Sequence, residues 1–267
     1  MKKILLFFGF LFVLISCRET KNLTNLNKSS LSSAKKERDE MEFNYSFIEG
    51  KKHMLLGNIE LATQHFHNCL DIRKNSDVVY YNLANLAILN NKYNEAQLNA
   101  EQAVAINPKN IWYKKLLVNI YKTTANFEKA DMLFQDMIQM DPNNLEILYD
   151  YAQFLTLTKN YEKAIELYDR IEKQITISET ISFEKERLYK KIGKTDLALK
   201  EIIKLSNAFP EEYKYKGLIA ESYMNKGQYE KAKNIYDSLL QNEQQQGLVR
   251  LALAEYYRVQ EAYAKGF

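Results

Sequence analysis

Apolar and polar positions alternate along most of this chain with the period of an α-helix. Within one stretch, Tyr80, Leu83, Ala84 and Ala87 follow one another at the spacing that places side chains on one face of a helix. A second stretch, 93–104, repeats this spacing after a short polar gap. The pattern therefore predicts two amphipathic helices joined by a tight turn.

This pair of helices recurs every 34 residues. Six small residues mark the period without an insertion, at Ala62, Ala96, Ala130, Ala164, Ala198 and Ala232. All three prolines stand twelve residues after one of these alanines, at Pro108, Pro142 and Pro210. Because proline cannot continue a helix, it ends the second helix of its pair. One such hairpin cannot bury its apolar face alone, so neighbouring hairpins must stack.

The period resembles the tetratricopeptide repeat, in its length and in its small, aromatic and proline positions. An aromatic residue precedes the marker alanine by three positions at Tyr93, Phe127, Tyr161 and Tyr229, and turn glycines precede it by five at Gly57, Gly193 and Gly227. The resemblance covers 43–267, with repeats beginning at residues 43, 77, 111, 145, 179, 213 and 247. It implies an all-α, right-handed solenoid of about 6.5 stacked helix hairpins with a concave groove.

The fifth repeat departs from the pattern. Glu186 occupies the small position beside Lys185, and Thr195 replaces the aromatic residue. We expect looser packing there, with a bend or a mobile joint. The helix that begins this repeat is rich in basic residues, interleaved with Glu184 and Glu186, which indicates a solvated face or a docking patch for an acidic partner.

Composition supports the helical prediction and removes several functional classes. The chain has 3 Pro and 8 Gly, whereas average usage at this length gives about 13 and about 19. Two cysteines exclude a disulfide scaffold and a four-cysteine zinc site. The formal charge of +3 provides no strong electrostatic footprint for nucleic acid.

The amino terminus has the features of a secretory signal. Lys2 and Lys3 precede an apolar stretch, 4–15, that would rise about 18 Å as a helix, too short to cross a bilayer core of about 30 Å. The residues Leu14-Ile15-Ser16-Cys17 resemble a bacterial lipoprotein signal. That resemblance implies cleavage after residue 16 and lipid attachment at Cys17.

Multiple acyl chains on Cys17 would anchor the protein stably. Arg18, rather than Asp, follows the cysteine, which favours the outer membrane of a Gram-negative bacterium, on its periplasmic face or at the cell surface. We expect 17–42 to be a flexible tether, because it is polar and has few aromatic or β-branched residues. Alternatively, its end extends the first helix by a turn or two.

Candidate chemistry is sparse. No glycine-rich phosphate loop, HExxH helix or nucleophile elbow is visible in the sequence, so we expect no enzyme, no cofactor and no metal site. His65 and Cys69 stand four residues apart and could share a metal ion, but Cys69 occupies a small core position and a buried role is expected. His53 is also at a packing position.

The resemblance places one row of first-helix residues on the concave face. Its ninth repeat position holds three successive amides, Asn85, Asn119 and Gln153, then Arg187. An amide offers both a donor and an acceptor, so the row is a candidate ladder for a bound peptide; alternatively these residues are only solvated. Four further candidates surround the row: Tyr81, Lys115, Tyr149 and Trp112, the only tryptophan. A true carboxylate clamp is not expected, because Gln153 and Phe183 depart from its pattern.

These features favour a non-catalytic, membrane-anchored scaffold that binds a protein or peptide in its groove, as an accessory part of an envelope assembly, secretion or motility complex. We expect no nucleic acid and no small-molecule substrate. Because the seventh repeat stops at Phe267, either the chain is a fragment or that face docks on something. A fragment would make it the amino-terminal sensor or recruitment part of a longer enzyme or signalling protein. A purely structural role is a third possibility.

Overall fold

The computed structural model describes residues 32–240, 254, 256–258 and 261. The predicted signal peptide, Cys17, the start of the predicted tether and most of the predicted seventh repeat lie outside these residues. The chain divides into two compact units, of which the first ends at Leu133 and the second begins at Phe134.

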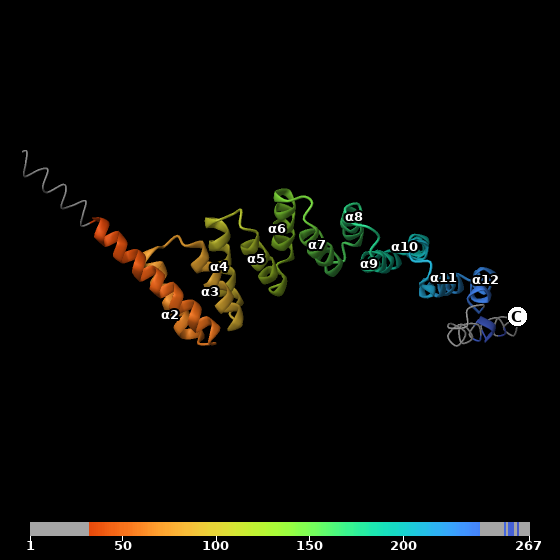
Figure 1. Ribbon diagram of the computed structural model, residues 1–267, viewed down its shortest axis with the longest axis horizontal. Coiled ribbons are helices and arrows are strands. Elements are labelled where there is room, and N and C mark those ends of the chain that lie inside the picture. Colours follow the sequence, from red (N-terminus) through yellow and green to blue (C-terminus); the bar gives the residue numbers. More distant parts are fainter. Residues whose placement is uncertain (1–31, 241–253, 255, 259–260, 262–267) are drawn as a thin grey trace, which may run out of the picture. The chain divides into compact units, whose positions relative to one another are not determined.

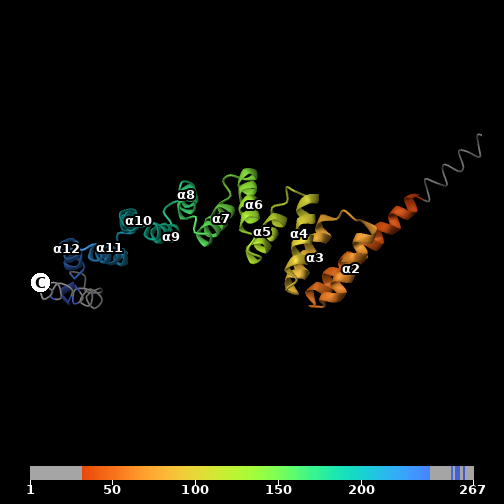
Figure 2. The same cartoon turned by 180° about the vertical axis from the view of Figure 1, so that it is seen from behind.

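The described part of the chain is helical and contains no strand. A helix over 32–55 comes first, eleven further helices follow in hairpins, and residues 254, 256–258 and 261 are also helical (Figure 1 and Figure 2). The eleven helices are α2 (Ile59–Ile72), α3 (Asp77–Leu89), α4 (Tyr93–Ile106), α5 (Ile111–Thr123), α6 (Phe127–Met140), α7 (Leu145–Leu157), α8 (Tyr161–Glu172), α9 (Glu179–Lys191), α10 (Thr195–Ala208), α11 (Tyr213–Asn225) and α12 (Tyr229–Leu240). The predicted all-α fold of successive helix hairpins is confirmed. None of these described helices combines the length and the apolar character that a bilayer crossing requires.

Packing within each unit follows the chain order. In the first unit α3 packs against α4, and α4 against α5; in the second unit α9 packs against α10, and α10 against α11. The first helices of five hairpins begin where the sequence places the starts of repeats, at Asp77, Ile111, Leu145, Glu179 and Tyr213. Each helix therefore buries one face in its own hairpin and another against the next hairpin, which is how a repeat array builds a continuous core.

The turn within each hairpin contains one residue of positive φ, between 55° and 76°. These residues are again 34 apart, at Gly57, Asn91, Ala125, Lys159, Gly193 and Gly227. The next N–H donates to a carbonyl five residues back, as from Lys92 to Ala87 at 2.8 Å, which is the Schellman arrangement at a helix end. Glycine adopts this φ without strain, whereas Ala125 and Lys159 carry a Cβ there.

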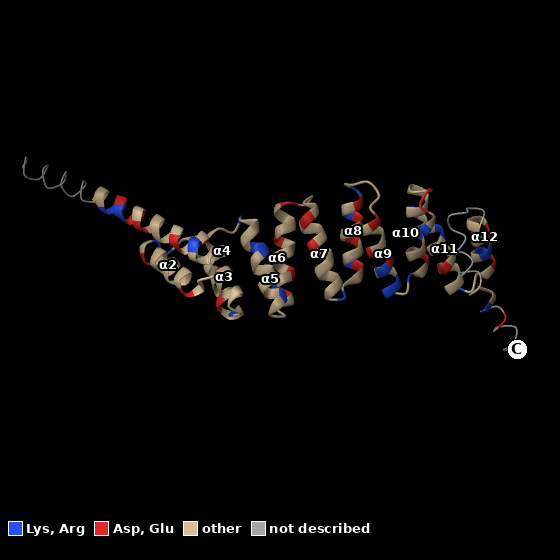
Figure 3. Ribbon diagram, turned by 60° about the horizontal axis from the view of Figure 1, so that its bottom comes forward, with Lys and Arg blue, Asp and Glu red and all other residues tan. Residues whose placement is uncertain are grey.

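The first described helix includes residues 32–42, for which the sequence leaves open a tether or an extension of the first helix; in the structure they extend the helix. Acidic and basic residues follow one another along this part of the helix (Figure 3), where they are mostly exposed. Such residues are good helix formers when they lie on a solvated face. Glu40 accepts a hydrogen bond of 2.6 Å from Arg73, whose guanidinium also lies 4.1 Å from the centre of the Phe43 ring. These contacts fix the helix to the end of α2.

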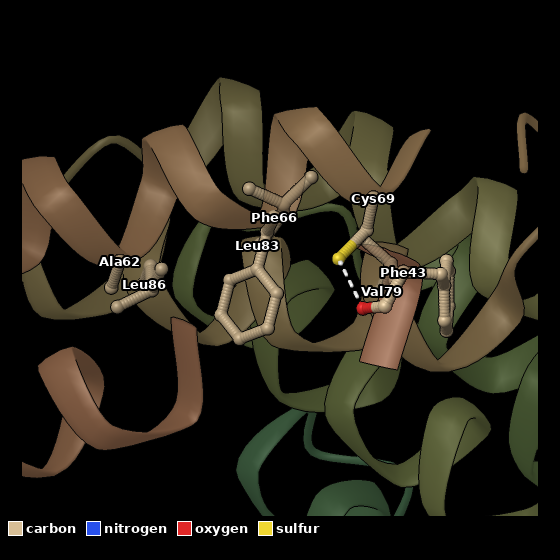
Figure 4. Packing of buried hydrophobic residues seen from close by; sticks show 7 residues of the cluster. All are labelled: Phe43, Ala62, Phe66, Cys69, Val79, Leu83 and Leu86. Atoms are coloured by element: carbon tan, nitrogen blue, oxygen red, sulfur yellow. Dashed lines mark hydrogen bonds between the residues drawn. The ribbon is translucent and has the colours of Figure 1, made fainter. Parts of the chain in front are cut away.

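A buried apolar cluster joins this helix to α2 and α3 (Figure 4). Its members are Phe43, Ala62, Phe66, Cys69, Val79, Leu83 and Leu86. The hairpin closes tightly at Gly50, where an added Cβ would lie 2.9 Å from the Phe66 ring. The Cys69 thiol is buried, donates to the Phe43 carbonyl at 3.6 Å, and has its pKa raised to about 11 by that burial. Cys69 therefore has a core role rather than a ligand role.

The fifth repeat contains a buried ionic network in place of an apolar joint. Lys185 is only 4% exposed and lies within 2.6–2.8 Å of carboxylate oxygens from Asp169, Glu172 and Glu201. Lys204 also reaches Glu172, at 2.6 Å. The sequence interpretation of a solvated or docking face is therefore wrong for Lys185, because carboxylates from α8 and α10 enclose its ammonium group.

Candidate functional site

Trp112 is the most exposed aromatic residue among those predicted for the groove, and it stands at the start of α5. Its indole is 63% exposed, and the Lys115 ammonium lies 5.1 Å from the ring centre. Asn110 caps the start of the helix, because its side-chain oxygen accepts a hydrogen bond of 3.0 Å from the backbone N–H of Trp112. An exposed indole beside a cation offers apolar contact and charge together at a fixed position.

Tyr81 links the corresponding face of α3 to α5. Its ring centre lies 5.0 Å from that of Tyr113, the residue after Trp112 in the chain. Asn85 lies one turn further along α3 and donates its amide N–H to the Tyr81 carbonyl at 2.8 Å. One donor of this amide is therefore used within its own helix, which leaves its oxygen and its second N–H for a ligand.

Asn119 is exposed and stands on the same side of α5 as Lys115, because the two residues are four apart in one helix. Five of the predicted site residues thus lie on α3 and α5. These five residues, the "first-unit face", are Tyr81, Asn85, Trp112, Lys115 and Asn119.

In the second unit, two predicted residues lie around the buried Tyr168 of α8. The Tyr149 ring of α7 meets the Tyr168 ring edge-on, with centres 6.0 Å apart. Burial, and then the carboxylate of Glu184, raise the pKa of Tyr168. The positive charge of Arg187, on α9, opposes this rise in the Tyr168 pKa. Arg187 is ion-paired with Glu184, and this pairing raises the pKa of the Arg187 guanidinium.

Gln153 is exposed on α7, one turn after Tyr149. Asn85 and Asn119 belong to the first unit, whereas Gln153 and Arg187 belong to the second. The predicted site residues therefore form one group in the first unit and another in the second. A continuous row of Asn85, Asn119, Gln153 and Arg187 stays a prediction.

One exposed surface was not predicted from the sequence. Four apolar side chains on the helix 32–55 lie on one face and are 63–85% exposed: Met41, Tyr45, Ile48 and Leu55. Their spacing of four, three and seven residues is a helical signal. Only Met41 belongs to the predicted tether; the other three residues lie in the predicted first repeat, where the repeat pattern does not single them out.

Three stretches of the chain match models of the tetratricopeptide repeat. The matched residues are 78–110, 124–175 and 213–246. A relative, anaphase-promoting complex subunit 3 of Schizosaccharomyces pombe, is 28% identical over 125 residues. The alignment covers 46% of this chain and only 18% of the relative's length.

Solved structures with the same arrangement of helices include a tetratricopeptide repeat protein from Parabacteroides merdae. It is 17% identical, with a TM-score of 0.55 over 85% of this chain and 94% of that chain. A second is YrrB, described as a tetratricopeptide repeat protein with an unusual peptide-binding site. It is 15% identical, with a TM-score of 0.51 over 62% of this chain and 86% of that chain. At these identities the similarity shows the fold alone.

Proposed function

Since this chain belongs to the tetratricopeptide repeat family, we propose that it is a non-catalytic scaffold that binds a protein or peptide partner on the first-unit face. We further propose that a lipid on Cys17 holds it at the outer membrane, within an envelope assembly, secretion or motility complex.

The observation that carries the binding proposal is the exposure of Trp112. Burial of an indole contributes more to binding than burial of most side chains, and tryptophan is enriched among residues that dominate interface energies. At 63% exposure, most of this ring is available to a partner. The neighbouring Lys115 and the ring pair of Tyr81 and Tyr113 hold the surface around it in place.

The amides of the first-unit face give it a way to hold an extended or helical peptide. Asn119 is exposed, and the Asn85 oxygen is not used in the bond to Tyr81. Such groups pair with peptide N–H and C=O groups whatever side chains the peptide carries, while Trp112 and Tyr81 select apolar residues. YrrB, which has the same fold, is described as having an unusual peptide-binding site, and this supports a peptide as the class of partner.

Photo-crosslinking in intact cells tests the binding proposal and identifies the partner in the same experiment. A photoreactive amino acid at position 112 is expected to yield a discrete crosslinked protein, identified by mass spectrometry. Leu98 of α4 is the matched control, because it is 65% exposed in the same unit but on a second helix. Asn119→Ala should reduce crosslinking from position 112. Equal crosslinking from positions 112 and 98, or none from position 112, would contradict the proposal.

Fractionation tests the anchor separately. We expect the whole protein in the membrane pellet and the Cys17→Ser variant in the soluble fraction, because a cleaved and acylated cysteine is the proposed attachment. A Cys17→Ser variant that stays in the pellet at the original level would show that the anchor is elsewhere. This outcome would leave the binding proposal standing.

A further inference from the structure

Three potential metal ligands meet in the first hairpin. Glu49 and His53 are one turn apart on the helix 32–55, and His65 lies on α2. Each offers a ligand atom, and the three atoms all lie within 4.8 Å of one another. The His53 and His65 rings are parallel, with centres 5.5 Å apart and planes at 7°.

The hydrogen bonds of these residues leave this group incomplete. The Glu49 oxygen and the His53 Nε2 are 3.8 Å apart, which is too long for a hydrogen bond. The His65 Nδ1 is buried and has no hydrogen-bond partner in the described part of the chain. A buried ring nitrogen without a partner is costly, so a ligand that completed this group would be stabilising.

The fold does not require these residue types at these positions. Glu49 is the seventh residue of its repeat, where other repeats carry Leu83, Leu117, Tyr151 and Ile219. His65 is the twenty-third, where other repeats carry Leu133, Leu167 and Ile235. Apolar side chains fill these places in most other repeats, the exceptions being Lys185 at the seventh position and Asn99 and Glu201 at the twenty-third, so packing alone does not explain a carboxylate and an imidazole in the first repeat.

We propose that Glu49, His53 and His65 bind one divalent transition-metal ion, of which Zn²⁺ is the best match, and that this ion joins the two helices of the first hairpin. Two imidazoles and one carboxylate are ligands that Zn²⁺ accepts in a four-coordinate site completed by water. Ligand bonds of about 2.0–2.2 Å require the three side chains to converge by about an ångström. All three are partly exposed, which leaves room for that movement.

Neighbouring side chains are placed to support this geometry. The Asn58 amide lies 3.2 Å from His53 Nδ1, so it orients the ring with Nε2 toward Glu49. Metal-bound imidazoles usually have such a partner on their second nitrogen, often a carbonyl oxygen, which Asn58 supplies when its amide is turned over. Lys52 pairs with Glu49 at 3.0 Å, but its side chain is 56% exposed and can turn into solvent as the cation arrives.

Titration calorimetry with Zn²⁺ alone tests the proposal. We use the whole chain with Cys17→Ser as the background, because that substitution removes the only thiol other than the buried Cys69. One Zn²⁺ is expected to bind per chain. His65→Ala and His53→Ala should each weaken binding at least about 100-fold, the upper end of the loss seen when only a supporting residue is removed. Asn58→Ala should weaken it about 10–100-fold.

His67→Ala is the matched control. His67 is an exposed histidine on the same helix, outside the group of three, and its loss should leave Zn²⁺ affinity unchanged. Circular dichroism confirms that each variant is folded, and a rise in melting temperature on Zn²⁺ addition should accompany binding in the background protein and in His67→Ala. Absence of binding by the background protein, or equal affinity after His65→Ala, would overturn the site. Neither result affects the proposed partner binding.

Discussion

The first and the fifth repeats place ionisable side chains at the same two positions, with different results. The seventh position holds Glu49 in one and Lys185 in the other, and the twenty-third holds His65 and Glu201. In the fifth repeat these two charges are paired with each other, and Asp169 and Glu172 from α8 complete the set around Lys185. In the first repeat the His65 Nδ1 has no hydrogen-bond partner among the described residues.

The comparison shows that one repeat position can serve two purposes. A closed group of charges, like that around Lys185, is satisfied by its own neighbours and needs no ligand. An open group, like that around His65, contains a ring nitrogen without a partner among the described residues, and an external cation could use this nitrogen as a ligand. The position of an ionisable residue in the repeat therefore does not show whether the residue can bind a ligand. What decides this is whether a neighbouring helix supplies a hydrogen-bond partner or a counter-charge for that residue.

The largest expected effect comes from Lys185→Ala. This change removes the ammonium and leaves Glu172 and Glu201 facing each other, partly buried and without their main counter-charge. Loss of one partner of a buried ion pair costs about 3–5 kcal/mol of unfolding free energy. Urea unfolding measures this loss. Lys190→Ala is the control, because Lys190 pairs with Glu186 at the surface and its loss should cost under about 0.5 kcal/mol. An equal loss of unfolding free energy in the two variants would show that Lys185 contributes no more to stability than a surface ion pair.

Conversion of the network to the apolar pattern of the other repeats should reverse this effect. Lys185→Leu combined with Glu172→Leu and Glu201→Leu places a leucine at each of the three buried positions. Replacement of buried ion pairs by apolar residues of similar size is neutral or stabilising by about 1–4 kcal/mol, and the two charges that remain, Asp169 and Lys204, have side chains that are 45% and 32% exposed and can be solvated. The same urea measurement applies, and a loss as large as that of Lys185→Ala would mean that the charges specify the joint itself.

Acid should weaken the fifth repeat through Glu172. Burial raises its pKa, but the hydrogen bonds from Lys185 and Lys204 and their charges outweigh burial and hold the pKa below the ordinary value of 4.5. A lowered folded pKa stabilises the protein above 4.5, and this contribution is lost as the pH falls through the folded pKa. Unfolding free energy measured from pH 6 to pH 3 should therefore fall, and Glu172→Gln should make the fall shallower. An unchanged slope in that variant would place the acid sensitivity elsewhere.

The smallest effect is expected from His65→Leu in the presence of a chelator. Leucine is the residue at this position in two other repeats, and the substitution removes a buried nitrogen that has no partner in the described structure. The unfolding free energy should change by less than about 1 kcal/mol, in either direction. A loss above about 2 kcal/mol would show that His65 has a structural partner and that the first repeat is as closed as the fifth.

The sequence predicted the helices well because the 34-residue period is itself a packing requirement. Helices α3, α5, α7, α9 and α11 begin at the residues where the apolar pattern restarts. The turns were harder to predict. A glycine in a turn indicates a positive φ, but Ala125 and Lys159 adopt a positive φ at the same position without being glycine. The residue types at these two positions do not favour a positive φ. The Schellman hydrogen bonds at the helix ends impose this backbone conformation instead.

The ionisable groups were the hardest to predict. The charge-rich sequence of α9 predicts a basic surface at Lys185, but the partners of this residue come from α8 and α10. Similarly, the spacing within α2 pairs His65 with Cys69, whereas Glu49 and His53 lie on the preceding helix. A comparison of the same position across repeats could have identified both groups, because ionisable residues stand in the first and fifth repeats at two positions that are apolar in most of the others.

Quenching of Trp112 fluorescence tests most directly whether a partner occupies the first-unit face. Trp112 is the only tryptophan, so the emission reports on one side chain, which is 63% exposed. In the free protein, acrylamide should quench this emission readily. Addition of the partner segment identified by crosslinking should shift the emission to shorter wavelength and reduce quenching several-fold. Emission and quenching that stay unchanged at a saturating concentration of that segment would contradict binding at this face.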